Sequence, residues 1–166
     1  PNFENYSMEN RTYRFFNGTP LYPFGYGLSY THFEYSQLSV DHTSVEEGTG
    51  VKVCATVRNT GPFESDEIVQ LYIKDLEAST RVPKCQLAGF RRIRLKPGET
   101  VKVIFSVTAH QMALIDDNGD CFLEPGAFRV FVGGSLPDTR SEELTGSPVP
   151  YADFTVTGDK PLKMRR

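Results

Sequence analysis

Apolar and polar residues alternate with a period of two through four separate stretches of this chain. These stretches are residues 51–58, 69–74, 101–107 and 128–133. In each of them every second residue is apolar, and most of the residues between are polar or small. A period of two is typical of β-strands, because successive side chains point to opposite faces of a sheet. The pattern predicts strands with one face in a core and the other toward solvent or a partner.

Turn-forming residues separate these stretches, at positions 59–62, 96–98, 117–119 and 124–126. Glycine supplies positive φ angles and proline a fixed φ, both of which tight turns need. Short alternating strands with frequent turns predict an all-β fold, an antiparallel immunoglobulin-like sandwich. A change of phase near Ser36 predicts a bulge or a strand change. Residues 109–114 are the one helical turn that we expect.

The segment from Pro20 to Thr31 reads PLYPFGYGLSYT and places aromatic rings between prolines and glycines. Proline removes backbone donors and glycine costs about 1 kcal/mol per helical position, so this segment is no regular helix. It is also too apolar for a solvated loop. We therefore predict an extended aromatic strap over residues 1–32, a sandwich over residues 33–157 and a solvated basic tail over residues 158–166.

Two surfaces could cover the rings of the strap. They pack either on the chain's own sheet or on a partner that is absent from this chain, and both remain open. Three apolar residues also interrupt polar positions on the outer faces of the predicted strands, namely Tyr72, Ile104 and Phe131. Exposed apolar patches of this kind mark contact surfaces. We expect these three side chains to meet something outside the chain.

The charge distribution excludes several functions. The net charge is −3 and the basic cluster lies at residues 160–166, which argues against nucleic-acid binding. No apolar run approaches the length of a membrane span.

The histidines are dispersed and no glycine-rich phosphate loop follows a strand, so we expect no metal and no cofactor. Asp116, Asn118 and Asp120 have calcium-loop spacing, but Cys121 and Ala127 occupy the Gly and Glu positions, which predicts an Asx turn instead.

Three glycosylation acceptor patterns begin at Asn5, Asn10 and Asn17. Their density favours a secreted, extracellular or lysosome-like location. The first residue is Pro and not Met, which suggests a fragment or a processed product. Three cysteines leave one odd thiol, and whether Cys85 and Cys121 form a disulfide is left open because sequence does not supply their separation.

Several short motifs, taken in order, resemble the C-terminal fibronectin type III-like domain of family 3 glycoside hydrolases, the β-glucosidases and β-xylosidases. The resemblance runs from about residue 13 to about residue 157. Besides the strap, it rests on VRNTG at 57–61, EIVQLYI at 67–73, LAGF at 87–90, LKPGE at 95–99, EPGAF at 124–128, VGGS at 132–135 and PDTR at 137–140.

This resemblance implies a non-catalytic accessory domain that stabilises the catalytic domains of a retaining β-xylosidase or β-glucosidase. The family's catalytic carboxylates lie in other domains, and neighbouring acidic pairs such as Asp66 and Glu67 are typical of solvated strand ends, so we expect no catalytic residue here. The expected contacts with the catalytic domains are Tyr13, Phe15, Tyr22, Phe24, Tyr26, Leu28 and Tyr30.

Two alternatives remain. In the first, exposed rings bind polysaccharide and the chain is a carbohydrate-binding module, with Tyr13, Phe15, Phe16, Tyr22 and Tyr26 as candidates. In the second, the chain is an extracellular protein-interaction domain.

Overall fold

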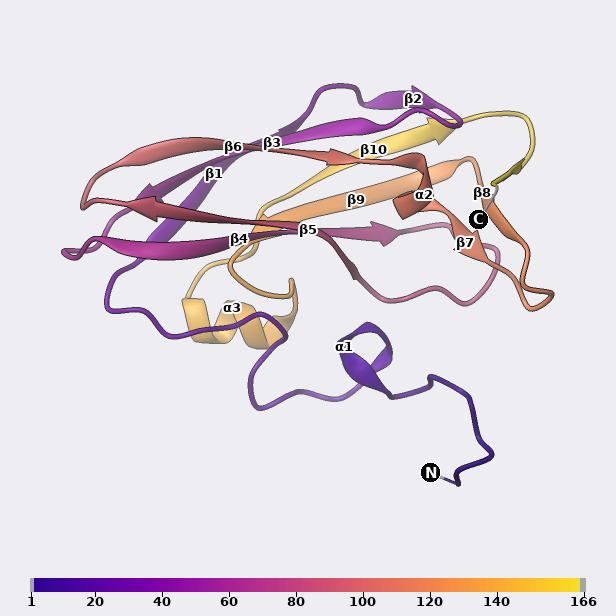
Figure 1. Ribbon diagram of the computed structural model, residues 1–166, viewed down its shortest axis with the longest axis horizontal. Coiled ribbons are helices and arrows are strands. Elements are labelled where there is room, and N and C mark those ends of the chain that lie inside the picture. Colours follow the sequence, from indigo (N-terminus) through magenta and orange to yellow (C-terminus); the bar gives the residue numbers. More distant parts are fainter. Residues whose placement is uncertain (1, 165–166) are drawn as a thin grey trace.

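The computed structural model describes residues 2–164, and most of its strands form a sandwich of two sheets (Figure 1). The three-stranded sheet has the order β1-β3-β6 and the five-stranded sheet the order β2-β10-β9-β4-β5. The strands are β1 (Phe33–Val40), β2 (Ser44–Glu46), β3 (Val51–Asn59), β4 (Ser65–Asp75), β5 (Gln86–Leu95), β6 (Thr100–Val107), β9 (Gly126–Gly133) and β10 (Tyr151–Thr157). A small third sheet of β7 (Leu114–Ile115), β8 (Cys121–Leu123) and β11 (Leu162–Lys163) lies at one end.

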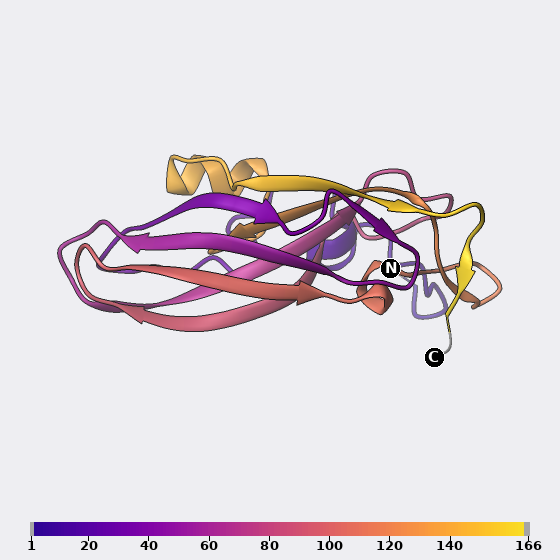
Figure 2. The same ribbon diagram turned by 90° about the horizontal axis from the view of Figure 1, so that it is seen from above.

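The predicted all-β sandwich is confirmed, with one departure from antiparallel order. Strands β2 and β10 pair in parallel, with Thr155 opposite Ser44. This pair arises because the chain leaves the three-stranded sheet after β1 and joins the five-stranded sheet as β2. Figure 2 shows the two layers from above.

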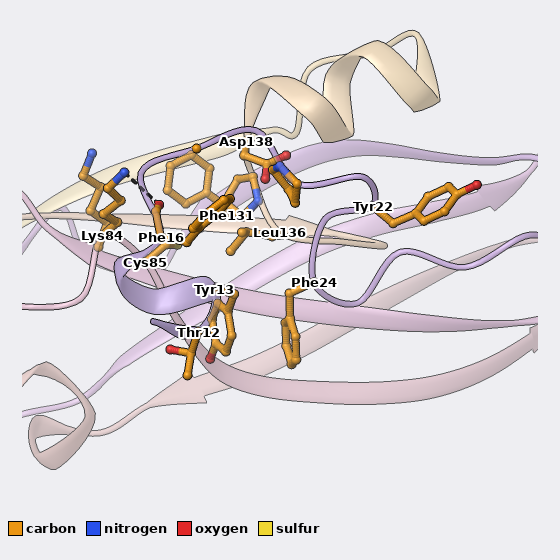
Figure 3. Close-up of a pocket in the computed structure, with 14 residues that line it drawn as sticks. Thr12, Tyr13, Phe16, Tyr22, Phe24, Lys84, Cys85, Phe131, Leu136 and Asp138 are labelled. Atoms are coloured by element: carbon orange, nitrogen blue, oxygen red, sulfur yellow. Dashed lines mark hydrogen bonds between the residues drawn. The ribbon is translucent and has the colours of Figure 1, made fainter. Parts of the chain in front are cut away.

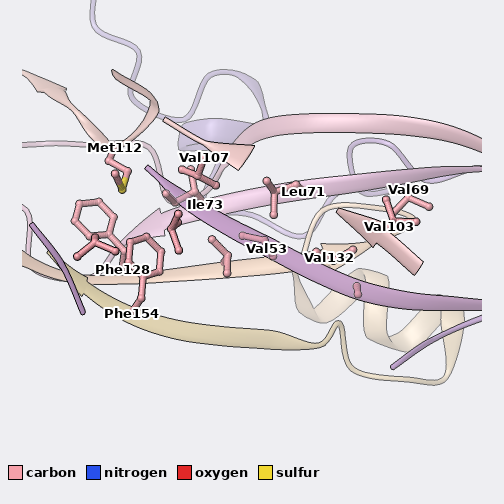
Figure 4. Packing of buried hydrophobic residues seen from close by; sticks show 14 of the residues in the cluster. Val53, Val69, Leu71, Ile73, Val103, Val107, Met112, Phe128, Val132 and Phe154 are labelled. Atoms are coloured by element: carbon pink, nitrogen blue, oxygen red, sulfur yellow. The ribbon is translucent and has the colours of Figure 1, made fainter. Parts of the chain in front are cut away.

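The core lies between the two sheets and is built from the alternating apolar residues. Val53, Leu71, Val103 and Val130 are completely buried there. The rings of Phe128 and Phe154 stack with centroids 5.6 Å apart near one end of this core, and Figure 4 shows the packing. Each such side chain contributes about 1.5–3 kcal/mol when it leaves water. The predicted periodicity therefore describes the buried faces correctly.

The irregularity predicted near Ser36 is a β-bulge in β1. Ser36 pairs with Thr56, whereas Ser39 already pairs with Cys54, so the register shifts between them. Gln37 adopts a positive φ of 51° within the bulge. The extra residue moves the alternation to the other face, which explains the change of phase in the sequence.

Three short helices accompany the strands within residues 2–164. The expected helical turn is confirmed as α2 (Ala109–Met112), where the Gln111 side chain accepts a hydrogen bond from the Thr108 N–H at 2.9 Å. Helices α1 (Thr12–Phe15) and α3 (Thr139–Thr145) were not predicted. Helix α3 had a readable signal, because Asp138 caps its first turn and Gly146 ends it with a φ of 73°.

The expectation of a solvated tail is wrong for part of residues 158–166. Leu162 and Lys163 form β11, which pairs with β8, and the Lys163 Nζ lies 2.9 Å from Asp120 Oδ1. The Asx turn is confirmed, since Asp116 Oδ1 accepts hydrogen bonds from the N–H groups of Asn118 and Asp120. This turn places Asp120 where Lys163 meets it, so the end of the described chain is held against the third sheet.

The cysteines are free thiols, so no disulfide links Cys85 to Cys121. Cys85 is buried, whereas Cys54 lies half-buried in β3. Within residues 2–164 no helix has the length and apolar character that crossing a membrane would require.

Candidate binding site at the strap

The strap lies across the outer face of the five-stranded sheet, the face that points away from the core, and Gln70 of β4 holds it there. The Gln70 side chain is buried, and its Nε2 donates hydrogen bonds to the carbonyl oxygens of Gly25 (3.1 Å) and Gly134 (2.6 Å). Its Oε1 accepts a hydrogen bond from the Tyr72 hydroxyl at 2.6 Å. A satisfied buried amide of this kind orients the segments around it. The strap, β4 and the loop after β9 are therefore joined through one side chain.

The prediction for Tyr72 was wrong. We expected its side chain to meet a partner outside the chain, but it is completely buried by the chain itself. Desolvation by this burial raises the pKa of its hydroxyl. Above it, the carbonyl oxygen of Phe24 accepts a hydrogen bond from the Leu136 N–H at 2.8 Å. The same expectation remains open for Ile104, which is 54% exposed on the other sheet, and for the half-buried Phe131.

A second attachment joins α1 to the loop between β4 and β5. The Lys84 N–H donates to the carbonyl oxygen of Arg14 at 2.9 Å, and its Nζ donates to that of Phe16 at 3.0 Å. The Tyr13 hydroxyl accepts a hydrogen bond from the Leu87 N–H at 3.3 Å. These bonds fix the strap around α1, just as Gln70 fixes it around Gly25.

Between these attachments the strap and the sheet enclose a pocket of about 600 Å³, which we call the strap pocket (Figure 3). The strap contributes Thr12, Tyr13, Phe16, Gly18, Pro20, Tyr22 and Phe24. The sandwich contributes Lys74, Lys84, Cys85, Phe131, Leu136, Pro137 and Asp138.

The lining of the strap pocket is aromatic, with charged groups among the rings. Tyr13 and Phe24 stack with centroids 4.0 Å apart and planes 11° apart, and Figure 3 shows the two rings facing each other. The Asp138 carboxylate is engaged, because it accepts a hydrogen bond from the Ser141 N–H at 2.7 Å. Desolvation by burial raises the pKa of the Cys85 thiol to about 12, so this thiol is protonated at neutral pH. The rings of the lining can therefore bind an apolar surface.

Two rows of side chains lead from the pocket across β9 to β10. Phe131 pairs with Tyr151 in one row, and their ring centroids are 6.0 Å apart. In the next row the Arg129 Nε lies 2.7 Å from Asp153 Oδ1, and the Arg129 guanidinium carbon lies 3.9 Å from the centroid of the Tyr151 ring. The hydrogen bonds from Arg129 lower the pKa of Asp153. This arrangement fixes a ring, a cation and a carboxylate side by side.

The residues predicted to contact another domain fall into two groups. Tyr13, Phe15 and Tyr26 are half-buried, and Tyr26 stacks on Tyr22 with centroids 5.7 Å apart. The remaining members, in order of increasing exposure, are Phe24 (43%), Tyr22 (60%), Leu28 (90%) and Tyr30 (92%). Contact of these residues with another domain stays a prediction.

The sequence interpretation missed the polar groups of the site. Lys74, Lys84 and Asp138 lie far apart along the chain and carry no local signal. Gln70 had one, because it stands among apolar residues in the run VQLYI, where an amide requires buried partners. Its partners Gly25 and Gly134 were not readable, since only the folded chain brings them together.

Residues 67–136 match the family of fibronectin type III-like domains. The chain is 38% identical over 139 residues to a putative β-xylosidase of Formosa agariphila and 41% identical over 125 residues to thermostable β-glucosidase B of Acetivibrio thermocellus. These matches cover 81% and 75% of this chain but 18% and 17% of the two relatives.

Solved structures agree with the sequence matches. The chain superimposes with a TM-score of 0.74 on β-glucosidase 3B of Thermotoga neapolitana, at 31% identity, covering 92% of this chain and 19% of that enzyme. A family 3 β-glucosidase of Bifidobacterium adolescentis gives a TM-score of 0.72 at 31% identity, covering 87% of this chain and 20% of that one. The chain spans about a fifth or less of the relatives that it matches. Its sequence and its two-layered fold together place it among the fibronectin type III-like domains of the family 3 β-glucosidases and β-xylosidases.

Proposed function

We propose that this chain is a non-catalytic accessory domain that docks, through the outward side of its strap, on the catalytic domains of a family 3 β-glycosidase. The observation that carries the proposal is the exposure of Leu28 and Tyr30, at 90% and 92%, in a strap that Gln70 attaches to the sandwich nearby, at Gly25. Apolar side chains that an ordered segment holds in solvent are typical of a contact surface.

The comparisons support a larger protein in which other domains carry the catalytic residues and this chain has a structural role. The relatives are β-xylosidases and β-glucosidases, which are hydrolases, and this chain corresponds to a small share of each. The proposed parent hydrolyses β-linked xylose or glucose with residues that lie outside this chain. The described residues contribute rigidity, since the strap is hydrogen-bonded to the sheet at Gln70 and to the loop between β4 and β5 at Lys84.

Docking would stabilise the parent by removing apolar area from water. Each square ångström of buried apolar surface contributes about 25 cal/mol, so even two fully covered side chains matter on the scale of a protein's net stability. A rigid strap also lowers the entropy lost on contact, because its backbone is already ordered.

The substitution pair Leu28→Ser and Tyr30→Ser tests this proposal in two settings. In the 166-residue chain alone, both side chains are exposed, so the melting temperature should stay within about 1 °C of the unsubstituted value. In the intact protein that carries this chain, the same pair should lower the melting temperature by several degrees and reduce glycosidase activity at elevated temperature. Equal melting temperatures of the substituted and unsubstituted intact protein would contradict docking through this surface.

A second measurement addresses the absence of catalysis. The purified 166-residue chain should hydrolyse neither aryl β-xylosides nor aryl β-glucosides above the buffer rate. Turnover that stays with this polypeptide through purification would refute the non-catalytic assignment.

We also propose that the protein is secreted and glycosylated on the strap. Asn5, Asn10 and Asn17 are all exposed, so an oligosaccharide transferase could reach them without unfolding the sandwich. Expression in a eukaryotic secretory host should give a chain whose mass falls on treatment with a peptide N-glycosidase. Secretion of an unmodified chain would contradict the glycosylation, and retention inside the cells would contradict the secretion.

A further inference from the structure

We propose that the strap pocket and the aromatic row beside it bind an acidic oligosaccharide, a β-linked sugar chain that carries a carboxylate. This activity goes beyond the docking proposed above, because it uses the side of the strap that faces the sheet. Docking rests on Leu28 and Tyr30, and neither of them lines the strap pocket.

The dimensions and lining of the pocket suit a sugar ring. Ligand pockets typically enclose about 300–1,000 Å³ and combine apolar walls with a few polar groups, and the strap pocket encloses about 600 Å³. Aromatic rings pack well against the C–H face of a pyranose. Here Tyr13 and Phe24 form a stacked wall, and Phe16 and Phe131 offer further ring surface.

Two ammonium groups in the pocket favour a negatively charged ligand. Lys74 and Lys84 both line the pocket, and neither forms an ion pair within residues 2–164. The Asp138 carboxylate accepts a hydrogen bond from the first turn of α3 and keeps its negative charge. The two ammonium groups outnumber the single Asp138 carboxylate in this ring-lined concavity, so positive charge is in excess there, and a carboxylate is the complementary group on a sugar.

The surface beside the pocket explains why the ligand is a chain and not a single sugar. Phe131 belongs to the pocket, and its cross-strand neighbour Tyr151 is 55% exposed. Arg129 lies over the Tyr151 ring, and Asp153 holds Arg129 in place with hydrogen bonds at 2.7 and 2.8 Å. A second sugar can meet the exposed part of the Tyr151 ring while its hydroxyls reach this charged pair. Neighbouring strands are spaced by about 4.8 Å, so successive rings lie close enough for adjoining sugars.

The test is isothermal titration calorimetry on the 166-residue chain with a xylo-oligosaccharide that carries a glucuronic acid branch. We expect saturable binding. A neutral xylo-oligosaccharide of the same length should bind about tenfold more weakly, which corresponds to about 1.4 kcal/mol. Free glucuronate should also bind about tenfold more weakly, because it cannot reach Tyr151. Raising the salt concentration should weaken the acidic ligand more than the neutral one.

Matched variants locate the site. Lys74→Gln removes a pocket charge, whereas Lys102→Gln removes an exposed charge on β6 of the opposite sheet. Phe16→Ala removes a pocket ring that is 41% exposed, and Phe63→Ala removes a ring that is 57% exposed but lies outside the pocket. We expect about tenfold weaker binding for the first variant of each pair and unchanged binding for the second.

Three outcomes would overturn the proposal. The first is no heat of binding with the branched oligosaccharide at millimolar concentration. The second is equal affinity for polyglutamate, which would reduce the effect to unspecific charge attraction. The third is an equal loss in Lys74→Gln and Lys102→Gln. Each of these outcomes would overturn oligosaccharide binding but leave the docking proposal standing. Docking is tested separately, with the Leu28 and Tyr30 variants of the intact protein.

Discussion

The side-chain amide of Gln70 donates a hydrogen bond to the carbonyl oxygen of Gly25 at 3.1 Å and so connects the centre of a core strand to the strap. Gly25 has a φ of +79°, and a Cβ atom placed on it would lie 2.1 Å from Gln70 Oε1. The strap approaches the sheet this closely because residue 25 has no side chain.

Gly25→Ala should release the part of the strap around residue 25 from the sheet. Alanine is strained at a positive φ and its methyl group would displace the Gln70 amide, at a local cost of about 1–3 kcal/mol. Limited proteolysis should then cut the strap about tenfold faster while the sandwich stays intact. The control is Gly27→Ala, since nothing lies within 4 Å of the Cβ position of Gly27. Equal cleavage rates for the two variants would show that Gly25 is not the attachment point.

Asn59→Ala should strongly destabilise the sandwich. The buried Asn59 amide donates to the carbonyl oxygens of Phe63 (2.7 Å) and Leu95 (3.0 Å), and its Oδ1 accepts from the Thr31 hydroxyl at 2.6 Å. Removing the amide removes these hydrogen bonds from a buried site, at a cost of about 2–4 kcal/mol in the free energy of unfolding. Urea denaturation measures this loss.

A matched asparagine provides the control for that experiment. Asn118→Ala lies in an exposed turn and should change the free energy of unfolding by about 0.5 kcal/mol or less. If the two alanine variants unfold at the same urea concentration, the buried network around Asn59 does not carry the stability that we assign to it.

Glu67 should make stability depend on pH in the direction opposite to most carboxylates. It faces the core, and the Tyr35 hydroxyl donates to its Oε1 at 2.5 Å. Desolvation by burial raises its pKa above the ordinary value of 4.5, so the folded chain binds this proton more tightly than the unfolded chain. The contribution of Glu67 to stability should therefore fall as pH rises from about 4.5 through the raised folded pKa.

Glu67→Gln isolates this effect, because the amide keeps the acceptor for Tyr35 but does not titrate. The free energy of unfolding of the unsubstituted chain minus that of the variant should decrease between pH 4 and pH 7. A difference that rises with pH would mean that Glu67 is stabilised as a carboxylate.

The thiols should react in an order set by burial. Cys85 is 7% exposed and its pKa is raised to about 12, whereas Cys54 and Cys121 are half-buried. At pH 8 iodoacetamide should modify Cys54 and Cys121 first, because the reactive thiolate of Cys85 is scarce and shielded. In urea without reductant all the cysteines should be labelled. Labelling of Cys54 alone would reveal a bridge between Cys85 and Cys121.

The sequence alone determined four of the strands, β3, β4, β6 and β9, and which of their faces is buried. The alternation in residues 51–58 and 101–107, the bulge near Ser36 and the turn at Asp116 follow from local rules, because each depends on neighbours within a few residues. The sequence left open whether the rings of the strap pack on the sheet or face outward, and the structure shows Leu28 and Tyr30 exposed.

The tertiary structure decided what covers the outer face of the five-stranded sheet. Tyr72 reads as an outward ring along β4, yet the strap and the loop after β9 bury it. The strap pocket likewise joins Lys74 and Lys84 to rings about sixty residues earlier in the chain. Local patterns record which face of a strand a side chain takes. They do not record which distant segment arrives there, because that choice depends on loop closure and on packing across the whole fold.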